Sequence, residues 1–189
     1  MRVISGILRG RKIFTPSNDR IRPTLDRIRE AIFNMVAFDI DEARVLDLFS
    51  GTGIMSIEAL SRGAKCSFAV DNHIESISLI EKNVKTCNLY NKIEIIFSDY
   101  KDFLYKSGQK GLKFDIIIAD PPYHEGISEN LIFDIDKSGV WHRNSIIIIE
   151  TDKSFDGVQR TEHLERIKDR TYSKTRVCVY KAESQETIL

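Results

Sequence analysis

Short apolar runs alternate with amphipathic segments along most of this chain of 189 residues. Runs typical of buried strands occupy residues 45–49, 65–71, 92–97, 114–120 and 145–150. Apolar residues recur at helical spacing over residues 27–37, 54–61, 75–87, 100–106 and 128–135. A helix between consecutive strands is the usual crossover of a parallel sheet. The pattern therefore predicts one α/β domain, with a mostly parallel, Rossmann-like sheet covered by helices on both faces.

The last part of the chain departs from this alternation. Residues 164–169 and 175–181 follow each other without a helix between them and carry the pattern of two antiparallel strands. We expect residues 184–189 to form a frayed tail.

Composition narrows the class of protein. No apolar run approaches the roughly 20 residues of a membrane span, and the first residues lack the unbroken apolar stretch of a signal peptide. The three cysteines are scattered without a CxxC pair, and the four histidines show no metal-ligand spacing. We therefore expect a cytoplasmic protein that needs no disulfide and no metal ion and does not contact a membrane.

A glycine-containing turn, DLFSGTG at residues 47–53, lies where the first predicted strand gives way to a helix. Gly51 and Gly53 permit backbone conformations, and a close approach to a ligand, that a Cβ atom would block. The turn lacks the third glycine of a dinucleotide-binding fingerprint and the Lys-Ser/Thr pair of a phosphate-binding loop. With Asp47 at its start, it fits a cationic ligand better than a pyrophosphate.

Acidic residues also follow the next two strands. Asp71 can accept hydrogen bonds from both ribose hydroxyls, as acids at this position do in NAD-binding folds. Asp99 could meet the exocyclic amine of adenine, although an acid before a helix is equally a candidate N-cap. A ribose, an adenine and a cation at one glycine turn describe S-adenosylmethionine. The candidate cofactor-binding residues are Asp47, Phe49, Ser50, Gly51, Thr52, Gly53, Asp71, Asn72, Ser98, Asp99 and Thr24.

A second motif, Asp120, Pro121, Pro122 and Tyr123, follows the fourth predicted strand. Two prolines fix two φ angles and remove two N–H donors, which leaves carbonyl oxygens free as acceptors. Asp120 and a neighbouring carbonyl can accept both hydrogens of an exocyclic amine, and Tyr123 offers a flat face to a base taken out of its stack. Such acceptors favour a pyramidal nitrogen whose lone pair points at the methyl group. We interpret the tetrapeptide as the catalytic centre; the alternative is a strand terminator with a surface tyrosine.

Residues 1–30 are basic, with eight Lys or Arg against three Asp or Glu, although the chain as a whole has zero net charge. A short basic segment on a mildly acidic body indicates local contact with a polyanion, whereas a solvated basic loop is the alternative. The candidate contacts to RNA phosphates are Arg9, Arg11, Arg22 and Arg27.

A glycine turn of this kind followed by Asp/Asn-Pro-Pro-Tyr/Phe resembles the motifs of amino-group methyltransferases of nucleic acids. The flanking segments RVISGILRGRK (2–12), RPTLDRIRE (22–30, with Phe33 and Asn34) and EALSRG (58–63) resemble the RsmD family of bacterial 16S rRNA guanine-N2-methyltransferases. The resemblance covers essentially the whole chain. It implies a seven-stranded class I methyltransferase fold with a small N-terminal β extension, S-adenosylmethionine as cofactor, and one guanine of 16S rRNA within the small ribosomal subunit as target. Ser173 departs from the family, which usually has glycine after this tyrosine, and the departure concerns the local turn.

Three other functions share parts of this pattern. A DNA amino-methyltransferase uses the same tetrapeptide, but this chain has no additional block for reading duplex sequence. Methylation of a protein glutamine also fits a Pro-Pro-Tyr loop, and the basic segment counts against it. A catalytically silent RNA-binding assembly protein would not need both motifs intact. We expect an RNA-contacting extension at residues 1–30, a methyltransferase domain at residues 31–183, and a monomeric protein.

Overall fold

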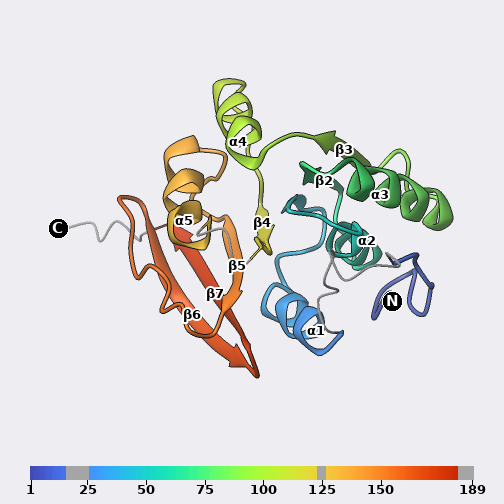
Figure 1. Cartoon of the computed structure of the whole chain (residues 1–189), viewed down its shortest axis with the longest axis horizontal. Coiled ribbons are helices and arrows are strands. Elements are labelled where there is room, and N and C mark those ends of the chain that lie inside the picture. The colour runs from blue at the N-terminus through green and yellow to red at the C-terminus, as the bar shows by residue number, and fades with distance from the viewer. Residues whose placement is uncertain (16–25, 123–126, 183–189) are drawn as a thin grey trace.

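The computed structural model describes residues 1–15, 26–122 and 127–182 of the chain. Seven strands form one sheet in the order β3-β2-β1-β4-β5-β7-β6 (Figure 1). Neighbours among β1 to β5 run parallel, and β7 runs antiparallel to both β5 and β6. The strands are β1 (Arg44–Leu48), β2 (Cys66–Asp71), β3 (Ile93–Phe97), β4 (Ile116–Ala119), β5 (Ile146–Asp152), β6 (Leu164–Tyr172) and β7 (Thr175–Ala182). The predicted seven-stranded, mostly parallel sheet with an antiparallel end is confirmed.

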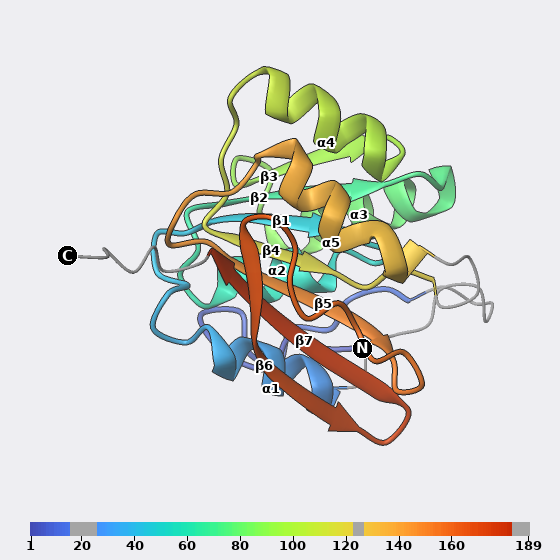
Figure 2. The same cartoon turned by 90° about the vertical axis from the view of Figure 1, so that its left-hand side faces the viewer.

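Helices cover both faces of the sheet (Figure 2). Buried side chains of α1, α2 and α3 join one apolar cluster, and those of α4 and α5 join a second cluster on the opposite face. The helices are α1 (Asp26–Met35), α2 (Ile54–Ser61), α3 (Ile74–Cys87), α4 (Tyr100–Gln109) and α5 (Ile127–Ser138). No helix within the described ranges is long and apolar enough to cross a membrane.

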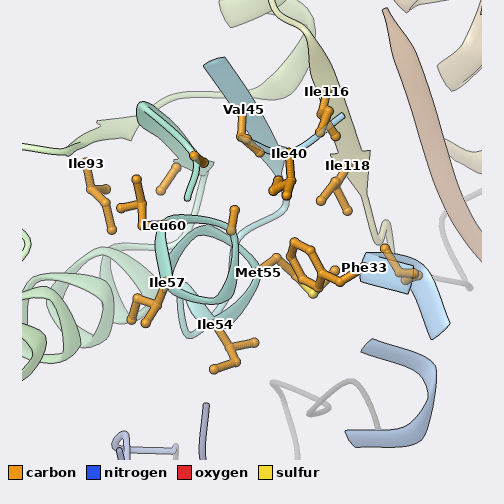
Figure 3. Close-up of a cluster of buried hydrophobic side chains, with 14 of the residues drawn as sticks. Phe33, Ile40, Val45, Ile54, Met55, Ile57, Leu60, Ile93, Ile116 and Ile118 are labelled. Carbon is orange, nitrogen blue, oxygen red and sulfur yellow. The ribbon is translucent and has the colours of Figure 1, made fainter. Parts of the chain in front are cut away.

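The central strands carry isoleucines toward both layers. In β4, Ile116 and Ile118 belong to the first cluster, whereas Ile117 and Ala119 belong to the second. Successive side chains of a strand point to opposite faces, so a strand buried on both sides reads as an unbroken apolar run. Figure 3 shows side chains of the first cluster gathered around α2, with Phe33 reaching it from α1.

The N-terminal segment packs against the C-terminal half of α2. Its expected β extension consists of one isolated antiparallel bridge between Arg2 and Lys12, which closes a tight loop. The backbone N–H groups of Ile4 and Ser5 donate to the two carboxylate oxygens of Glu58, at 2.8 and 3.0 Å. These N–H groups bond to a side chain of α2 and not to a strand, so the loop is attached to this helix and not to the sheet.

A fully buried ion pair fixes the segment to α1 as well. The guanidinium of Arg29 lies 3.7 Å from the Glu58 carboxylate and donates to the Arg2 carbonyl oxygen at 2.7 Å. Both charged side chains have no exposed surface, and removing one partner of such a pair typically costs about 3–5 kcal/mol. The boundary expected after residue 30 falls inside α1, so the start of the chain is integrated with the domain that follows it.

Candidate functional site

Four features predicted from the sequence lie at one edge of the sheet, where the parallel strands β1 to β4 end. They are the glycine loop, Asp71, the Ser98-Asp99 pair and the tetrapeptide that begins at Asp120. Leu48 of β1 is paired with Ala119 of β4, so the glycine loop and Asp120 follow neighbouring strand ends. On the other side of β1, Asp71 closes β2 beside Phe97, the last residue of β3. The chain leaves β1 toward β2 on one side and passes from β4 to β5 on the other. Such a switch point is where open α/β sheets bind ligands.

The glycine loop has the unusual backbone that its sequence predicts. Phe49, Gly51 and Gly53 have φ angles of 64°, 54° and 75°, in the left-handed region that favours glycine. A Cβ atom on Gly53 would lie 3.2 Å from Cγ2 of Ile80, which is tighter than an ordinary contact. The two glycines therefore allow the loop to turn sharply into α2 while it packs closely on α3.

Asp71 links the glycine loop to the end of β2. Its Oδ2 accepts the N–H of Gly51 at 2.8 Å, and its Oδ1 accepts the N–H of His73 at 2.9 Å. The residue is 8% exposed, and a carboxylate has about four acceptor sites, so each oxygen keeps capacity for a ligand hydroxyl. Asn72, the next residue, is exposed at the same edge.

Asp47 lies behind the loop, at 2% exposure. Its Oδ2 accepts both the N–H and the hydroxyl of Ser56, at 3.0 and 2.7 Å, and Ser67 in turn donates to the Ser56 hydroxyl. Burial raises the pKa of Asp47 from 3.8 to about 7, against the lowering effect of the bonds from Ser56. The structure therefore places this carboxylate as an internal support of α2, whereas the sequence pattern suggested contact with a cation.

This raised pKa gives a prediction for stability. The folded-state pKa of Asp47, about 7, lies above the ordinary value of 3.8. The burial of this group therefore stabilises the protein fully below pH 3.8, and that stabilisation is lost as the pH rises through 7. Between pH 5 and pH 8 we expect the unfolding free energy of the wild type to fall by roughly 2–3 kcal/mol more than that of Asp47→Asn. Urea unfolding at several pH values measures this difference, and parallel pH profiles of the two proteins would contradict it.

The third predicted acid, Asp99, is an N-cap. Its side chain accepts the N–H of Lys101 at 2.8 Å at the start of α4, while Ser98 donates to the Asp99 carbonyl. Both residues follow β3 at the same edge as Asp71. The ring of Tyr100 packs against Phe49 of the glycine loop at 5.1 Å between centroids, which connects this strand end to the loop.

The tetrapeptide begins directly after β4. Asp120 is half-buried, Pro121 is buried and Pro122 is exposed. Ala119 and Asp120 therefore carry the motif from the sheet interior to the edge where the parallel strands end. Tyr123, Arg22 and Thr24 lie outside the described residues.

The structure does not bring Arg9 and Arg11 to this edge. Arg9 follows Leu8, whose N–H donates to Ser61 at the C-terminal end of α2, at 2.9 Å. Burial raises the pKa of the Cys87 thiol and the charge of Arg11 opposes that rise, which places Arg11 near the end of α3. Both helix ends point away from the glycine loop. Arg27, which is exposed in the first turn of α1, lies toward the edge with the motifs, because α1 leads into the opposite end of β1.

Sequence reasoning missed Asn83, which connects the N-terminal segment to the glycine loop. This fully buried residue of α3 accepts the N–H of Phe14 at 2.7 Å and donates to the carbonyl oxygens of Phe14 and Thr52, at 3.0 and 2.9 Å. Its spacing from Ile80 and Cys87 places it on the apolar face of the helix. A polar residue in that position was the available signal, since a buried amide needs partners.

The whole chain is similar to one family of proteins. A family model described as conserved hypothetical protein 95 matches residues 1–181. Ribosomal RNA small subunit methyltransferase D of Buchnera aphidicola is 38% identical over 151 residues, which cover 80% of this chain and 78% of that protein. The protein of the same name from Escherichia coli is 34% identical over 152 residues, 80% of this chain and 75% of the relative. The solved structure of the Escherichia coli protein yhhF has a TM-score of 0.85 and 27% identity, covering 98% of this chain and 99% of that one.

Proposed function

Because this chain belongs to the family described as conserved hypothetical protein 95, the RsmD family, we propose that it transfers a methyl group from S-adenosylmethionine to the N2 amine of a guanine in 16S rRNA. The observation that carries this proposal is the pairing of Leu48 with Ala119. It sets the glycine loop and the Asp120 motif side by side, so a donor on the loop and an acceptor amine at the motif would be neighbours.

The residues at the edge suit S-adenosylmethionine, which supplies an electrophilic methyl group on a sulfonium when it is bound. Gly51 and Gly53 would let the backbone of the loop approach the ligand closely, and Asp71 keeps acceptor capacity for ribose hydroxyls. Asn72, Ser98 and the backbone after β3 are the proposed contacts of the adenine. Asp47 supports the loop from behind, through Ser56.

In the proposed reaction, Asp120 orients the guanine amine by accepting one of its hydrogens, and the Pro121 carbonyl accepts the other. Tyr123 is assigned from its sequence position to stack on the extruded base. Asp120 does not have to be a strong base, because the methylated ammonium loses its proton readily. Catalysis by these residues comes from alignment, and from acceptors arranged in advance for the positive charge that develops on nitrogen.

The substrate RNA is proposed to contact Arg27 near the site and Arg9 and Arg11 farther away, with Arg22 assigned from the sequence. Phosphate contacts of this kind fix the register of an RNA without reading its bases. An assembled or assembling small subunit is large enough to reach all of them. A ribosomal substrate supports the proposal that the protein acts in the cytoplasm.

The contribution of the N-terminal arginines can be tested by salt dependence. Replacing Arg9 and Arg11 by Ala removes two exposed cations, so fewer counterions are released on binding. We expect weaker binding to small subunits and a shallower dependence of affinity on salt, by about 1.4–1.8 in logarithmic slope. Affinity for S-adenosylhomocysteine should stay the same. An identical salt slope in the double variant would remove these two residues from the substrate surface.

The proposed function is tested by transfer of a labelled methyl group to different acceptors. We expect label from S-adenosylmethionine in the rRNA of small subunits isolated without this modification. Large subunits, duplex DNA and a glutamine-containing protein extract serve as competing acceptors. Label in DNA or protein alone would favour one of the other methyltransferase classes, and binding of RNA without any transfer would indicate a silent assembly protein.

A further inference from the structure

We propose that a second RNA-binding surface, formed by Lys153, Arg170 and Lys174, holds phosphates on the side of the target base away from the cofactor. We call these three residues the hairpin tip. The inference rests on the proposed function, since it assigns part of the RNA contact to this surface. Arg170 and Lys174 lie close together at the β6–β7 turn, whereas Lys153 is distant in the sequence and the fold brings it to the same end of the sheet.

The sheet register places the hairpin tip at the same edge as Asp120. Ile149 of β5 is paired with Ala119, and Asp152, the last residue of β5, is paired with Thr175 at the start of β7. The N–H of Lys153 donates to the Lys174 carbonyl oxygen at 2.9 Å, which joins the end of β5 to the β6–β7 turn. Figure 2 shows this turn projecting beside the first turn of α1.

Along the sheet edge where β1 to β5 end, the hairpin tip lies on the opposite side of β4 from the candidate cofactor residues. The candidate cofactor residues follow β1, β2 and β3, whereas β5, β7 and β6 lie beyond β4 in the sheet order. Lys153 follows β5, Lys174 precedes β7 and Arg170 lies on β6, which are one, two and three strands from β4. Neighbouring strands are about 4.8 Å apart, so the three residues are displaced from Asp120 by about 5–15 Å across the sheet. At roughly 3.4 Å per stacked nucleotide, that distance spans about two to four nucleotides of an RNA strand.

The charges of the hairpin tip are available for a ligand. Lys153, Arg170 and Lys174 are all exposed, and none has an acidic partner among the residues that the structure describes. Arg176 differs, because its guanidinium is paired with Asp156 at 3.0 Å and with Asp169 at 3.2 Å. Within the described ranges, acids therefore neutralise the inner cation Arg176 and pair with none of the outer three.

The turn that presents Lys174 is well defined. Ser173 has a φ angle of 57°, the left-handed conformation that the family's usual glycine adopts without strain. The side chain of Asp152 accepts both the N–H and the hydroxyl of Ser154, at 2.9 and 2.6 Å, so this acid is engaged in its own turn. Hydrogen bonds of Asp152 thus hold the turn after β5, and the bond from the Lys153 N–H to the Lys174 carbonyl oxygen joins the β6–β7 turn to it.

The test compares two double variants of the full-length protein. Lys153→Ala with Lys174→Ala removes two charges from the hairpin tip. Lys65→Ala with Lys92→Ala removes two equally exposed lysines that precede β2 and β3, at the opposite edge of the sheet. Binding to small subunits that lack the modification is measured over a range of salt concentrations, with S-adenosylhomocysteine affinity and thermal unfolding as controls on folding.

We expect the hairpin-tip variant to bind subunits about tenfold or more weakly near 0.1 M salt, with a slope smaller by about 1.4–1.8. Its cofactor affinity and unfolding temperature should match the wild type, and the opposite-edge variant should bind subunits normally. An unchanged slope in the hairpin-tip variant, or an equal loss in both variants, overturns the inference and leaves the proposed function intact. A wild-type protein that neither binds nor methylates small subunits overturns both.

Discussion

Asp120→Ala is expected to abolish most methyl transfer while it leaves cofactor affinity largely unchanged. Asp120 follows β4, next to the glycine loop, and is the proposed acceptor for one hydrogen of the target amine. Without that acceptor the amine is held by the Pro121 carbonyl alone, and its lone pair is no longer directed at the methyl donor. Single-turnover methylation of small subunits that lack the modification measures the loss, and calorimetry with S-adenosylhomocysteine measures binding.

Asp120→Asn is the matched variant for this position. It keeps an acceptor oxygen but loses the negative charge that stabilises a positive nitrogen, so an intermediate rate is expected. The order wild type, Asn, Ala in rate is the specific outcome of an acceptor role. Full activity of Asp120→Ala, in a protein that folds normally, would show that the tetrapeptide is not the catalytic centre.

The second large effect is expected at Asp71. Asp71→Ala removes the proposed acceptor of the ribose hydroxyls and also leaves the Gly51 N–H without its partner at 2.8 Å. Loss of hydrogen bonds to a charged acceptor typically costs about 1.5–3 kcal/mol, or roughly 10- to 150-fold in affinity. Calorimetric titration with S-adenosylhomocysteine checks this value.

Asp102→Ala is a suitable control for this titration, because Asp102 is an exposed acid of α4 outside the glycine loop and the strand ends. It removes the same charge and should bind the cofactor normally. If folded Asp71→Ala binds as tightly as the control, Asp71 has only a structural role.

The fold could be predicted from the sequence because its strands and helices have strong periodic patterns. The helix at residues 54–61 was predicted with the bounds that α2 has, and the isoleucine runs of β4 and β5 indicated strands buried on both faces. Helix ends were less accurate: α4 continues to Gln109 and α5 to Ser138, past the last clear apolar positions. The N-terminal β extension consists of one bridge, and the N–H groups of Ile4 and Ser5 donate to Glu58, a partner too distant in the sequence to be foreseen.

The positions of candidate site residues were predictable where they depend on the strand ends. Asp71 and Asp120 lie at one edge of the sheet because the parallel strands end there, and the glycine loop has the φ angles that its glycines suggested. The roles that depend on side-chain partners were not predictable. Asp47 points to Ser56 inside the protein, and Asn83 binds Phe14 and Thr52 through contacts across the fold.

The local density of basic residues in the sequence also predicted only part of the proposed RNA-binding surface. Local density in the sequence drew attention to Arg9 and Arg11, which lie near the far ends of α2 and α3. The hairpin tip joins Lys153 to two cations that follow it at a distance in the sequence, so only the pairing of β5 with β7 identifies it.

The central claim is that the methyl group is transferred directly to one guanine N2 amine of 16S rRNA, which Asp120 orients. Nucleoside mass spectrometry of small-subunit rRNA, after reaction with the purified protein and S-adenosylmethionine, tests it most directly. We predict one N2-methylguanosine per rRNA molecule with the wild type and almost none with Asp120→Ala. A methylated adenosine or cytidine, a methyl group on another guanine atom, or no modified nucleoside at all would contradict the claim.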